Sequence, residues 1–170
     1  MIFQHTWKLI LEGKKWETRR PVKPGERTLF SDDTNTLMVL GANGRIKWEQ
    51  GKTYAIQPGR GQKAVARRKL LAIRQERLQD ISFDDLVAEG MEVDASEFDD
   101  PCDVYDEFQN AQQEYEKLWD KINARKGTRW DENPMVWVLT FEVAIRRTPW
   151  SLCPHAYQRI SIPRWFTSAA

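Results

Sequence analysis

The chain has 170 residues, of which 41% are hydrophobic, and this length and composition predict one folded domain rather than a disordered chain. No segment approaches the roughly 18 consecutive apolar residues that span a membrane, and the first residues lack the charged and apolar regions of a signal peptide. Two cysteines do not make a disulfide framework, so the sequence predicts a soluble, cytoplasmic protein.

The formal net charge of +1 conceals an uneven distribution of charge along the chain. Residues 1–81 carry 17 Lys and Arg against 8 Asp and Glu, residues 82–133 carry 5 against 16, and residues 134–170 carry 4 against 1. A basic surface attracts polyanions such as RNA, but the acidic segment opposes that attraction. Mutual attraction of the two halves explains the pattern equally well.

The first half of the chain reads as one short helix followed by short strands. Apolar residues at helical spacing predict a helix over residues 5–12, and Gly13 follows it. A strand over residues 16–20 ends at Pro21. Asn43-Gly44 is a dipeptide typical of tight hairpin turns, so it predicts a hairpin between residues 36–40 and 45–48. Residues 53–57 form the next predicted strand.

The second half combines two helices with two longer strands. Residues 63–74 are interpreted as a long strand, although their apolar residues follow neither period cleanly. Ser82 and the acidic residues after it predict the start of a helix over 83–89. An apolar stripe predicts a longer helix over 103–126, and the apolar run 135–145 predicts a buried strand. The proline-containing tail is expected to pack on the surface.

The segment GKKWETRRP, residues 13–21, is the most distinctive candidate site. On a strand, Trp16, Thr18 and Arg20 face one way, while the residues between them face the other way. Crowded cations disfavour protonation, so the pKa of Lys15 is expected to be lowered. A neutral lysine is a general base and a nearby hydroxyl is a nucleophile, which makes Lys15 and Thr18 a candidate catalytic pair.

Other candidate sites are weaker. Cys102, Cys153 and His155 do not have the paired spacing of zinc ligands, so no metal is predicted. The loop around Arg60, Pro-Gly-Arg-Gly, lacks the spacing of known phosphate-binding loops. Exposed tryptophans could stack on nucleobases, and Trp16 lies beside the candidate pair.

Four segments of the chain resemble ASCH domains of the PUA-like superfamily. They are ILEGKKWETRRP, GKTYAIQPGRG, RQERLQDISFDDLVAEGM and LWDKINARKGTRWDENPMVWVLTFEV. The resemblance covers most of residues 3–145 and is loose between residues 26 and 50. It implies an α+β fold: a PUA-like β-barrel with short peripheral helices and one longer inserted helix.

The resemblance also implies a site. The superfamily includes RNA binders, a reported ribonuclease, and amidohydrolases that deacylate N4-acetylcytidine with a lysine, a threonine three residues later and a glutamate in a later helix. In this sequence those positions are Lys15, Thr18 and Glu89. Trp16 and Glu17 replace smaller residues usual around the threonine, and the acidic segment 92–133 and the tail lengthen the chain beyond compact members.

These observations combine into one hypothesis and its alternatives. The expected protein is a single domain over residues 1–147 with a helical acidic insertion at about 92–133 and a packed tail over 148–170. It is expected to hydrolyse N4-acylated cytosine nucleosides without a metal or organic cofactor, as a monomer or homodimer. Lys15, Thr18 and Glu89 are the expected catalytic residues, and Arg20, Trp16 and Arg60 the expected substrate-binding residues. The alternatives are an RNA-binding module, with or without nuclease activity, and a structural protein without pocket chemistry.

Overall fold

The computed structural model describes residues 1–93, 101–124 and 127–144. Helices and strands within these ranges alternate along the chain as follows: α1 (Trp7–Leu11), β1 (Glu17–Pro21), β2 (Arg27–Ser31), β3 (Thr36–Leu40), β4 (Ile46–Glu49), β5 (Thr53–Ile56), β6 (Ala66–Arg77), η1 (Leu78–Asp80), α2 (Phe83–Ala88), α3 (Pro101–Asn123), η3 (Trp130–Glu132) and β7 (Met135–Ala144). Together they confirm the predicted α+β class.

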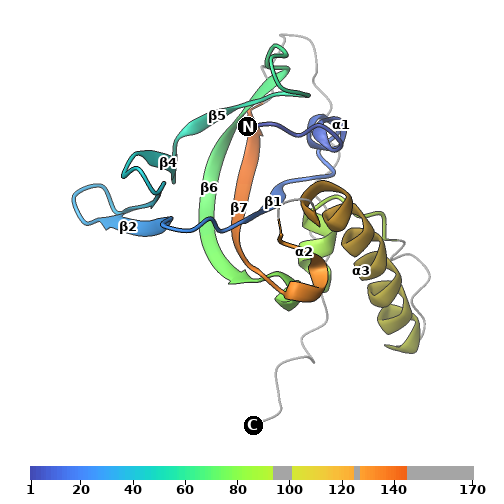
Figure 1. The fold of residues 1–170 in the computed structure, drawn as a ribbon. Helices are drawn as coiled ribbons and strands as arrows, with labels where there is room; N and C mark the ends of the chain where they lie inside the picture. The colour runs from blue at the N-terminus through green and yellow to red at the C-terminus, as the bar shows by residue number, and fades with distance from the viewer. Residues whose placement is uncertain (94–100, 125–126, 145–170) are drawn as a thin grey trace, which may run out of the picture.

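The strands form two antiparallel sheets. One has the order β1-β7-β6-β5 and the other the order β2-β3-β4. The long strands β6 and β7 pair along their length, with a bulge between Leu70 and Ala72. The smaller sheet lies on one side of β6 and β7, and helices α2 and α3 lie on the other (Figure 1). The central sheet therefore has two covered faces, and each face carries its own set of inward side chains.

Helix α2 has strong local signals for its beginning and its end. The Ser82 side chain accepts a hydrogen bond from the Asp85 backbone N–H, and the Asp85 carboxylate accepts one from the Ser82 backbone N–H. Glu89 is the C-cap, and Gly90 follows with a φ of +86° that ends the helix. The backbone N–H of Trp16 donates to the Ala88 carbonyl at 3.0 Å. The end of α2 is thereby fixed beside the start of β1.

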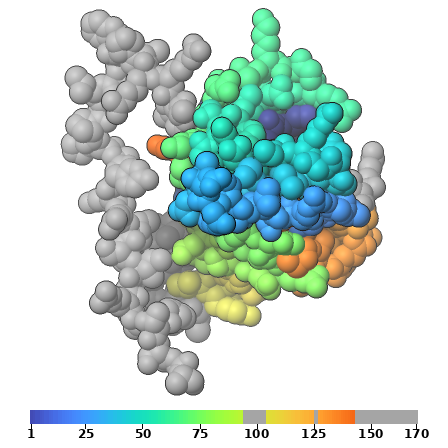
Figure 2. Space-filling view, turned by 90° about the vertical axis from the view of Figure 1, so that its left-hand side faces the viewer, coloured from blue at the N-terminus to red at the C-terminus, as the bar shows by residue number. Residues whose placement is uncertain are grey.

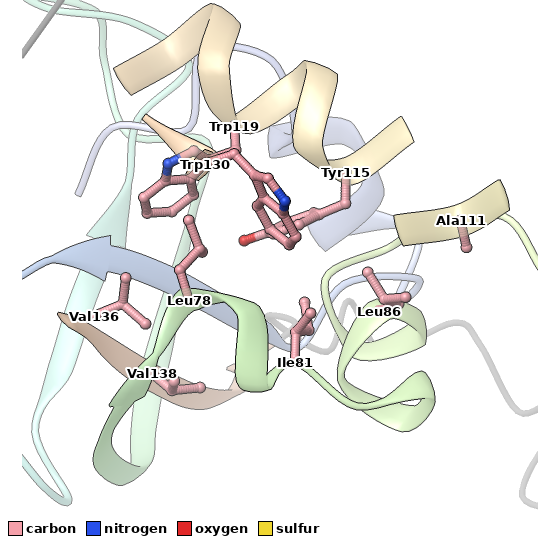
Figure 3. Packing of buried hydrophobic residues seen from close by; sticks show 9 residues of the cluster. All are labelled: Leu78, Ile81, Leu86, Ala111, Tyr115, Trp119, Trp130, Val136 and Val138. Carbon is pink, nitrogen blue, oxygen red and sulfur yellow. The ribbon is translucent and has the colours of Figure 1, made fainter. Parts of the chain in front are cut away.

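The acidic segment contributes to the hydrophobic core rather than standing apart from it. Ala111, Tyr115 and Trp119 of α3 are buried against residues of η1, α2 and β7 (Figure 3). The full cluster is Leu78, Ile81, Leu86, Ala111, Tyr115, Trp119, Trp130, Val136 and Val138. A second cluster fills the space between the two sheets and consists of Val39, Trp48, Leu70, Ile73, Trp137 and Leu139. Helix α3 is thus a structural part of the domain.

Most predicted elements are present, with shifted ends. The predicted strand 63–74 is β6 and runs from Ala66 to Arg77, whereas the predicted hairpin and the helix 83–89 lie where expected. Strand β2 was not predicted, because residues 27–30 are exposed and show no alternation of polar and apolar residues. No helix in the described ranges is long and apolar enough to cross a membrane. The predicted tail, 148–170, lies outside the described residues.

Candidate functional site

Lys15 and Glu89, which are 74 residues apart in sequence, meet in a buried ion pair. Their side chains are only 3% and 4% exposed. The Lys15 Nζ contacts Oε2 of Glu89 and also donates to the Glu89 backbone carbonyl at 2.7 Å. The fold therefore brings together two of the three residues expected to be catalytic.

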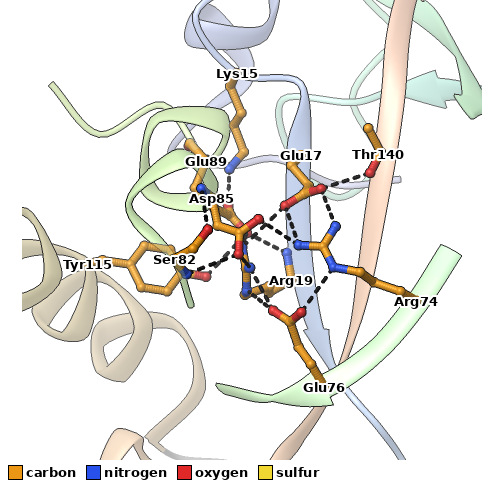
Figure 4. Close-up of polar contacts among 10 residues, drawn as sticks. All are labelled: Lys15, Glu17, Arg19, Arg74, Glu76, Ser82, Asp85, Glu89, Tyr115 and Thr140. Atoms are coloured by element: carbon orange, nitrogen blue, oxygen red, sulfur yellow. Dashed lines mark hydrogen bonds and ion pairs between the residues drawn. The ribbon is translucent and has the colours of Figure 1, made fainter. Parts of the chain in front are cut away.

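The Glu89 carboxylate has more donors than Lys15 alone. Its Oε1 accepts from the Arg19 backbone N–H at 2.6 Å, from the Tyr115 hydroxyl at 3.3 Å and from Arg19 Nη1 at 3.5 Å (Figure 4). These donors come from β1 and α3, and Lys15 contacts the other carboxylate oxygen. These contacts hold the Glu89 side chain in one orientation.

Burial is the main cause of a lowered pKa for Lys15. Glu89 opposes that effect, while the neighbouring cations Arg20 and Arg19 lower the pKa further. The direction agrees with the expectation from the sequence, but the expected cause, crowding of cations, is secondary to desolvation. Lys14, one residue earlier, has a side chain that is 56% exposed and pairs with Glu92 at 3.8 Å. Only one of the two adjacent lysines belongs to the buried site.

A network of ion pairs supports the Arg19 side of β1. The buried Arg19 guanidinium binds Glu76 at 2.7 Å and Asp85 at 2.9 Å. Arg74 binds Glu17 at 2.6 Å and Asp85 at 2.6 Å. Strands β1 and β6 and helix α2 are joined by these contacts (Figure 4). The network fixes the strand whose backbone N–H holds Glu89.

Asp85 takes part in both the network and the cap of α2. Burial raises the pKa of Asp85, but hydrogen bonds from Ser82 and the charges of Arg19 and Arg74 outweigh burial, so the net pKa is lowered. The carboxylate therefore stays ionised when it links α2 to the two arginines.

Thr18 lies on the other side of β1 from Arg19, as the alternation of a strand predicts. It is 5% exposed and pairs in register with Leu139. In the part of the chain that the structure describes, its hydroxyl makes no hydrogen bond with Lys15 or Glu89. Thr18 therefore lies in sequence between Lys15 and Arg19, which both bind Glu89, but its own side chain does not take part in that contact.

Arg20 shares the Thr18 side of β1. Its Nη2 donates to the Ile2 carbonyl at 2.7 Å, and its guanidinium carbon lies 5.3 Å from the centre of the Phe3 ring. Burial lowers the pKa of Arg20, although the charge of Glu89 opposes that effect. Arg20 thus interacts electrostatically with both Lys15 and Glu89.

Trp16 and Arg60 have different positions relative to the pair. Trp16 is 41% exposed and lines a groove of about 570 Å³ together with Lys14, Gly90 and Met91. The groove passes near the backbone end of Lys15, because a Cβ on Gly90 would lie 3.1 Å from the Lys15 Cβ. Lys15, Thr18 and Glu89 themselves are not among its lining residues. Arg60 is exposed in the loop after β5, and no contact among the described residues links it to the pair.

The sequence did not identify Tyr115 or Arg68 as site residues. Tyr115 was noted only as part of the apolar stripe of α3, where it supplies a buried hydroxyl. Arg68 is fully buried on β6 and lies two residues before Leu70, which faces the core. The alternation of a strand places Arg68 on that same face, which was the available signal.

No group of His, Cys, Asp and Glu among the described residues has the arrangement of a metal site. Cys153 and His155, considered from the sequence, lie outside the described residues, as does the side chain of Cys102.

Comparison with known proteins supports the fold. No protein-family model matches the sequence, and no curated protein matches it. The structure is similar to that of protein EF3133 from Enterococcus faecalis V583, of the family DUF984, with 13% identity, a TM-score of 0.52, and coverage of 92% of this chain and 78% of that one. An ASCH domain from Lactobacillus crispatus JV V101 has 12% identity, a TM-score of 0.42, and coverage of 81% and 69%. The likeness to the DUF984 protein shows a shared fold and nothing further.

Proposed function

We propose that this chain is an amidohydrolase that removes the acyl group from small N4-acylated cytosine nucleosides. The observation that carries the proposal is the buried Lys15–Glu89 pair at the edge of the strand that holds Thr18. Burying two ionisable groups costs free energy that apolar side chains of the same size would not cost. Such pairs are concentrated at sites where the protonation of one group has a chemical use.

Lys15 has the hydrogen-bonding arrangement that a general base needs. A neutral amine has two N–H donors and one lone pair. The two donors are satisfied by the Glu89 carboxylate and the Glu89 carbonyl, so the lone pair remains to accept the proton of the Thr18 hydroxyl. The lowered pKa of Lys15 increases the fraction of neutral amine near pH 7.

The reaction then proceeds in two balanced stages. Lys15 takes the proton of Thr18, and the Thr18 oxygen attacks the acyl carbonyl to give a tetrahedral intermediate. The bond from the acyl carbon to N4 breaks as Glu89, protonated by Lys15, donates the proton to the leaving cytosine amine. Lys15 then takes a proton from water, and the water oxygen attacks the acyl carbon of the Thr18 ester. The bond from the acyl carbon to the Thr18 oxygen breaks, Lys15 returns the proton to that oxygen, and the carboxylic acid leaves.

Two further residues support this assignment. Arg20 lies on the Thr18 side of the strand and is a cation available there to bind the substrate. The exposed indole of Trp16 lies at a groove next to Lys15 and offers a face on which the cytosine ring stacks. Arg60, in the loop after β5, receives no role in the proposed reaction.

The RNA-binding alternative has fewer exposed cations in the segment GKKWETRRP than the sequence suggests. Lys15 and Arg19 are both buried and paired with carboxylates. Lys14 and Arg60 are exposed and remain available for phosphate contacts. Binding of RNA through these two surface cations would weaken strongly with added salt.

The proposal is tested by incubating the purified protein with N4-acetylcytidine and measuring release of cytidine. Thr18→Val keeps the shape of the side chain and removes only the hydroxyl, so it is expected to abolish turnover while the unfolding midpoint stays near that of the parent. Thr28→Val, on the exposed strand β2, is the matched control and is expected to retain full activity. Absence of turnover on every N4-acylated cytosine substrate would exclude the proposed reaction, and full activity of Thr18→Val would exclude Thr18 as the nucleophile.

A further inference from the structure

Arg68 is a fully buried cation that lacks a carboxylate partner. Its exposed fraction is 0%, and its Nε and Nη1 have no hydrogen-bond partner among the described residues. In the part of the chain that the structure describes, the hydrogen-bond partner of the remaining nitrogen, Nη2, is the Met1 sulfur, which is a weak acceptor. An unpaired charge in a protein interior destabilises the folded state, so a bound anion would stabilise this position.

The surroundings of Arg68 are apolar and cationic. Its guanidinium carbon lies 4.4 Å from the centre of the Phe3 ring and 4.1 Å from that of Phe141. Ring faces offset part of the cost of burying a cation, but they bring no neutralising charge. The Arg20 guanidinium lies against the same Phe3 ring. Two arginines from different strands therefore share one small region.

Glu89, the acidic residue whose charge acts on both arginines, already binds other residues. Glu89 interacts with Arg68 and Arg20 through its charge, but its carboxylate makes its bonds with Lys15 and Arg19. Within the described ranges, neither Arg20 nor Arg68 forms an ion pair. Burial, and next the charge of Arg20, lower the pKa of Arg68 to about 9. The region thus carries two positive charges that nothing described neutralises.

We propose that Arg20 and Arg68 form a subsite for a phosphate monoester. Arginine is suited to tetrahedral oxyanions because its planar fork binds two oxygens at once. A monoester phosphate carries a charge close to −2 near pH 7 and so neutralises both arginines. An internal phosphate of an RNA strand carries one negative charge and cannot enter a buried site without the chain on either side of it. The subsite therefore takes a terminal phosphate.

The first residues of the chain lie against both arginines: the Met1 sulfur contacts Arg68, and the Ile2 carbonyl accepts a hydrogen bond from Arg20. The hydrogen bond between Arg20 and the Ile2 carbonyl is exposed to solvent, and Ile2 itself is 39% exposed. Figure 2 shows the first residues, in dark blue, recessed among cyan and green atoms. A phosphate oxygen that displaces the Met1 sulfur would give Arg68 a charged acceptor in place of a weak one.

The subsite has a consequence for the reaction, and this consequence rests on the proposed function. Arg20 and Arg68 both act electrostatically on Glu89, so a phosphate bound between them lies near the catalytic pair. The preferred substrate is then an N4-acylcytidine 5′-monophosphate rather than the nucleoside.

Binding is tested first, without any assay of activity. The unfolding midpoint of the full chain is measured in inorganic phosphate and in chloride at equal ionic strength. Phosphate is expected to raise the midpoint in a concentration-dependent way. Arg68→Met is expected to bind phosphate at least about tenfold more weakly, the factor that one lost charge-assisted contact gives. In chloride, Arg68→Met is expected to be as stable as the parent or more stable, because it removes an uncompensated charge. A purely structural arginine would give the opposite sign.

Two variants keep the test decisive. Arg67→Gln changes the neighbouring exposed residue on the other face of β6 and is expected to keep the phosphate response. Arg20→Gln is expected to weaken phosphate binding, and it decides the matter if Arg68→Met does not fold. The proposal is overturned if phosphate does not stabilise the parent protein, or if Arg67→Gln loses the response as much as Arg68→Met and Arg20→Gln do.

The failure of this proposal differs from failure of the proposed reaction. Phosphate binding that depends on Arg68, without turnover of either N4-acetylcytidine or its 5′-monophosphate, would reject the reaction and keep the subsite. Turnover of the nucleoside with no phosphate response and no preference for the monophosphate would reject the subsite and keep the reaction. Turnover with kcat/KM at least about tenfold higher for the monophosphate, lost in Arg68→Met, supports both.

Discussion

The buried Lys15–Glu89 pair predicts a large coupling free energy in a double-mutant cycle. It also predicts unequal losses of stability in the two single variants. Glu89→Gln leaves Lys15 buried beside Arg19 and Arg20 without a counter-charge, and removing one partner of a buried pair costs about 3–5 kcal/mol. Lys15→Met leaves Glu89 with its donors from Arg19 and Tyr115, so its cost is nearer that of lost hydrogen bonds, about 1–3 kcal/mol.

The double variant Lys15→Met/Glu89→Gln removes both charges together. The single losses sum to about 4–8 kcal/mol. Replacing a buried pair by neutral residues of similar size is often close to neutral in stability, so the double variant is expected to lose several kcal/mol less than this sum. The free energies of unfolding are measured in urea from tryptophan fluorescence. Single losses that add, within about 0.5 kcal/mol, would refute the pairing.

The pH dependence of Glu89→Gln gives a second check on the same reasoning. Glu89 raises the pKa of Lys15 in the parent protein, so its removal moves the folded-state pKa further below the ordinary value of 10.5. Between these two values the unfolded chain binds more protons than the folded chain, and the stability therefore rises with pH by up to about 1.4 kcal/mol per unit. The variant is expected to recover part of its lost stability as the pH rises toward 10.5. A loss that is constant over this range would show that Lys15 does not titrate there.

Two further predictions concern residues that surround the pair. Tyr115→Phe removes the hydroxyl that donates to Glu89 Oε1. It is expected to lower kcat on N4-acetylcytidine with little change in KM, and to lower the free energy of unfolding by about 0.5–1.5 kcal/mol. An unchanged kcat would show that Tyr115 does not position Glu89. Gly90→Ala strains a residue with a φ of +86° and places a Cβ 3.1 Å from the Lys15 Cβ. The free energy of unfolding is therefore expected to fall by about 1–3 kcal/mol, and activity assays are expected to show a loss of turnover. Gly13→Ala, with a φ of +75° and open space around its Cβ, is the matched control and should lose stability only; equal effects on activity would show that the contact with Lys15 is irrelevant.

Local signals in the sequence were sufficient for most of the secondary structure. The capping pattern at Ser82 and the glycine at position 90 placed α2 correctly, because both act within a few residues of the helix ends. Asn43-Gly44 located the turn between β3 and β4 for the same reason. Strand β2 was missed because it depends on pairing with β3 and has no buried face of its own.

The candidate site required information that local patterns do not contain. Lys14 and Lys15 are equivalent in sequence, yet one is exposed and the other buried, because only the second meets the end of α2. The resemblance of the segments to ASCH domains suggested Glu89 as the partner, and the structure brings it to Lys15. Tyr115 reaches Glu89 from α3, a helix that belongs to the acidic segment. No periodicity within that helix predicts which of its apolar positions points toward the site.

The two adjacent arginines of β1 explain why the reaction is assigned to one face of the strand. Arg19 points toward α2 and is neutralised there by Glu76 and Asp85, so its charge serves to hold the strand in place. Arg20 points the other way, where the described residues offer it no carboxylate. A cation without a carboxylate partner is suited to bind an anion such as a phosphate. Thr18 shares the face of Arg20, whereas the face of Arg19 carries the ion pairs with Glu76 and Asp85.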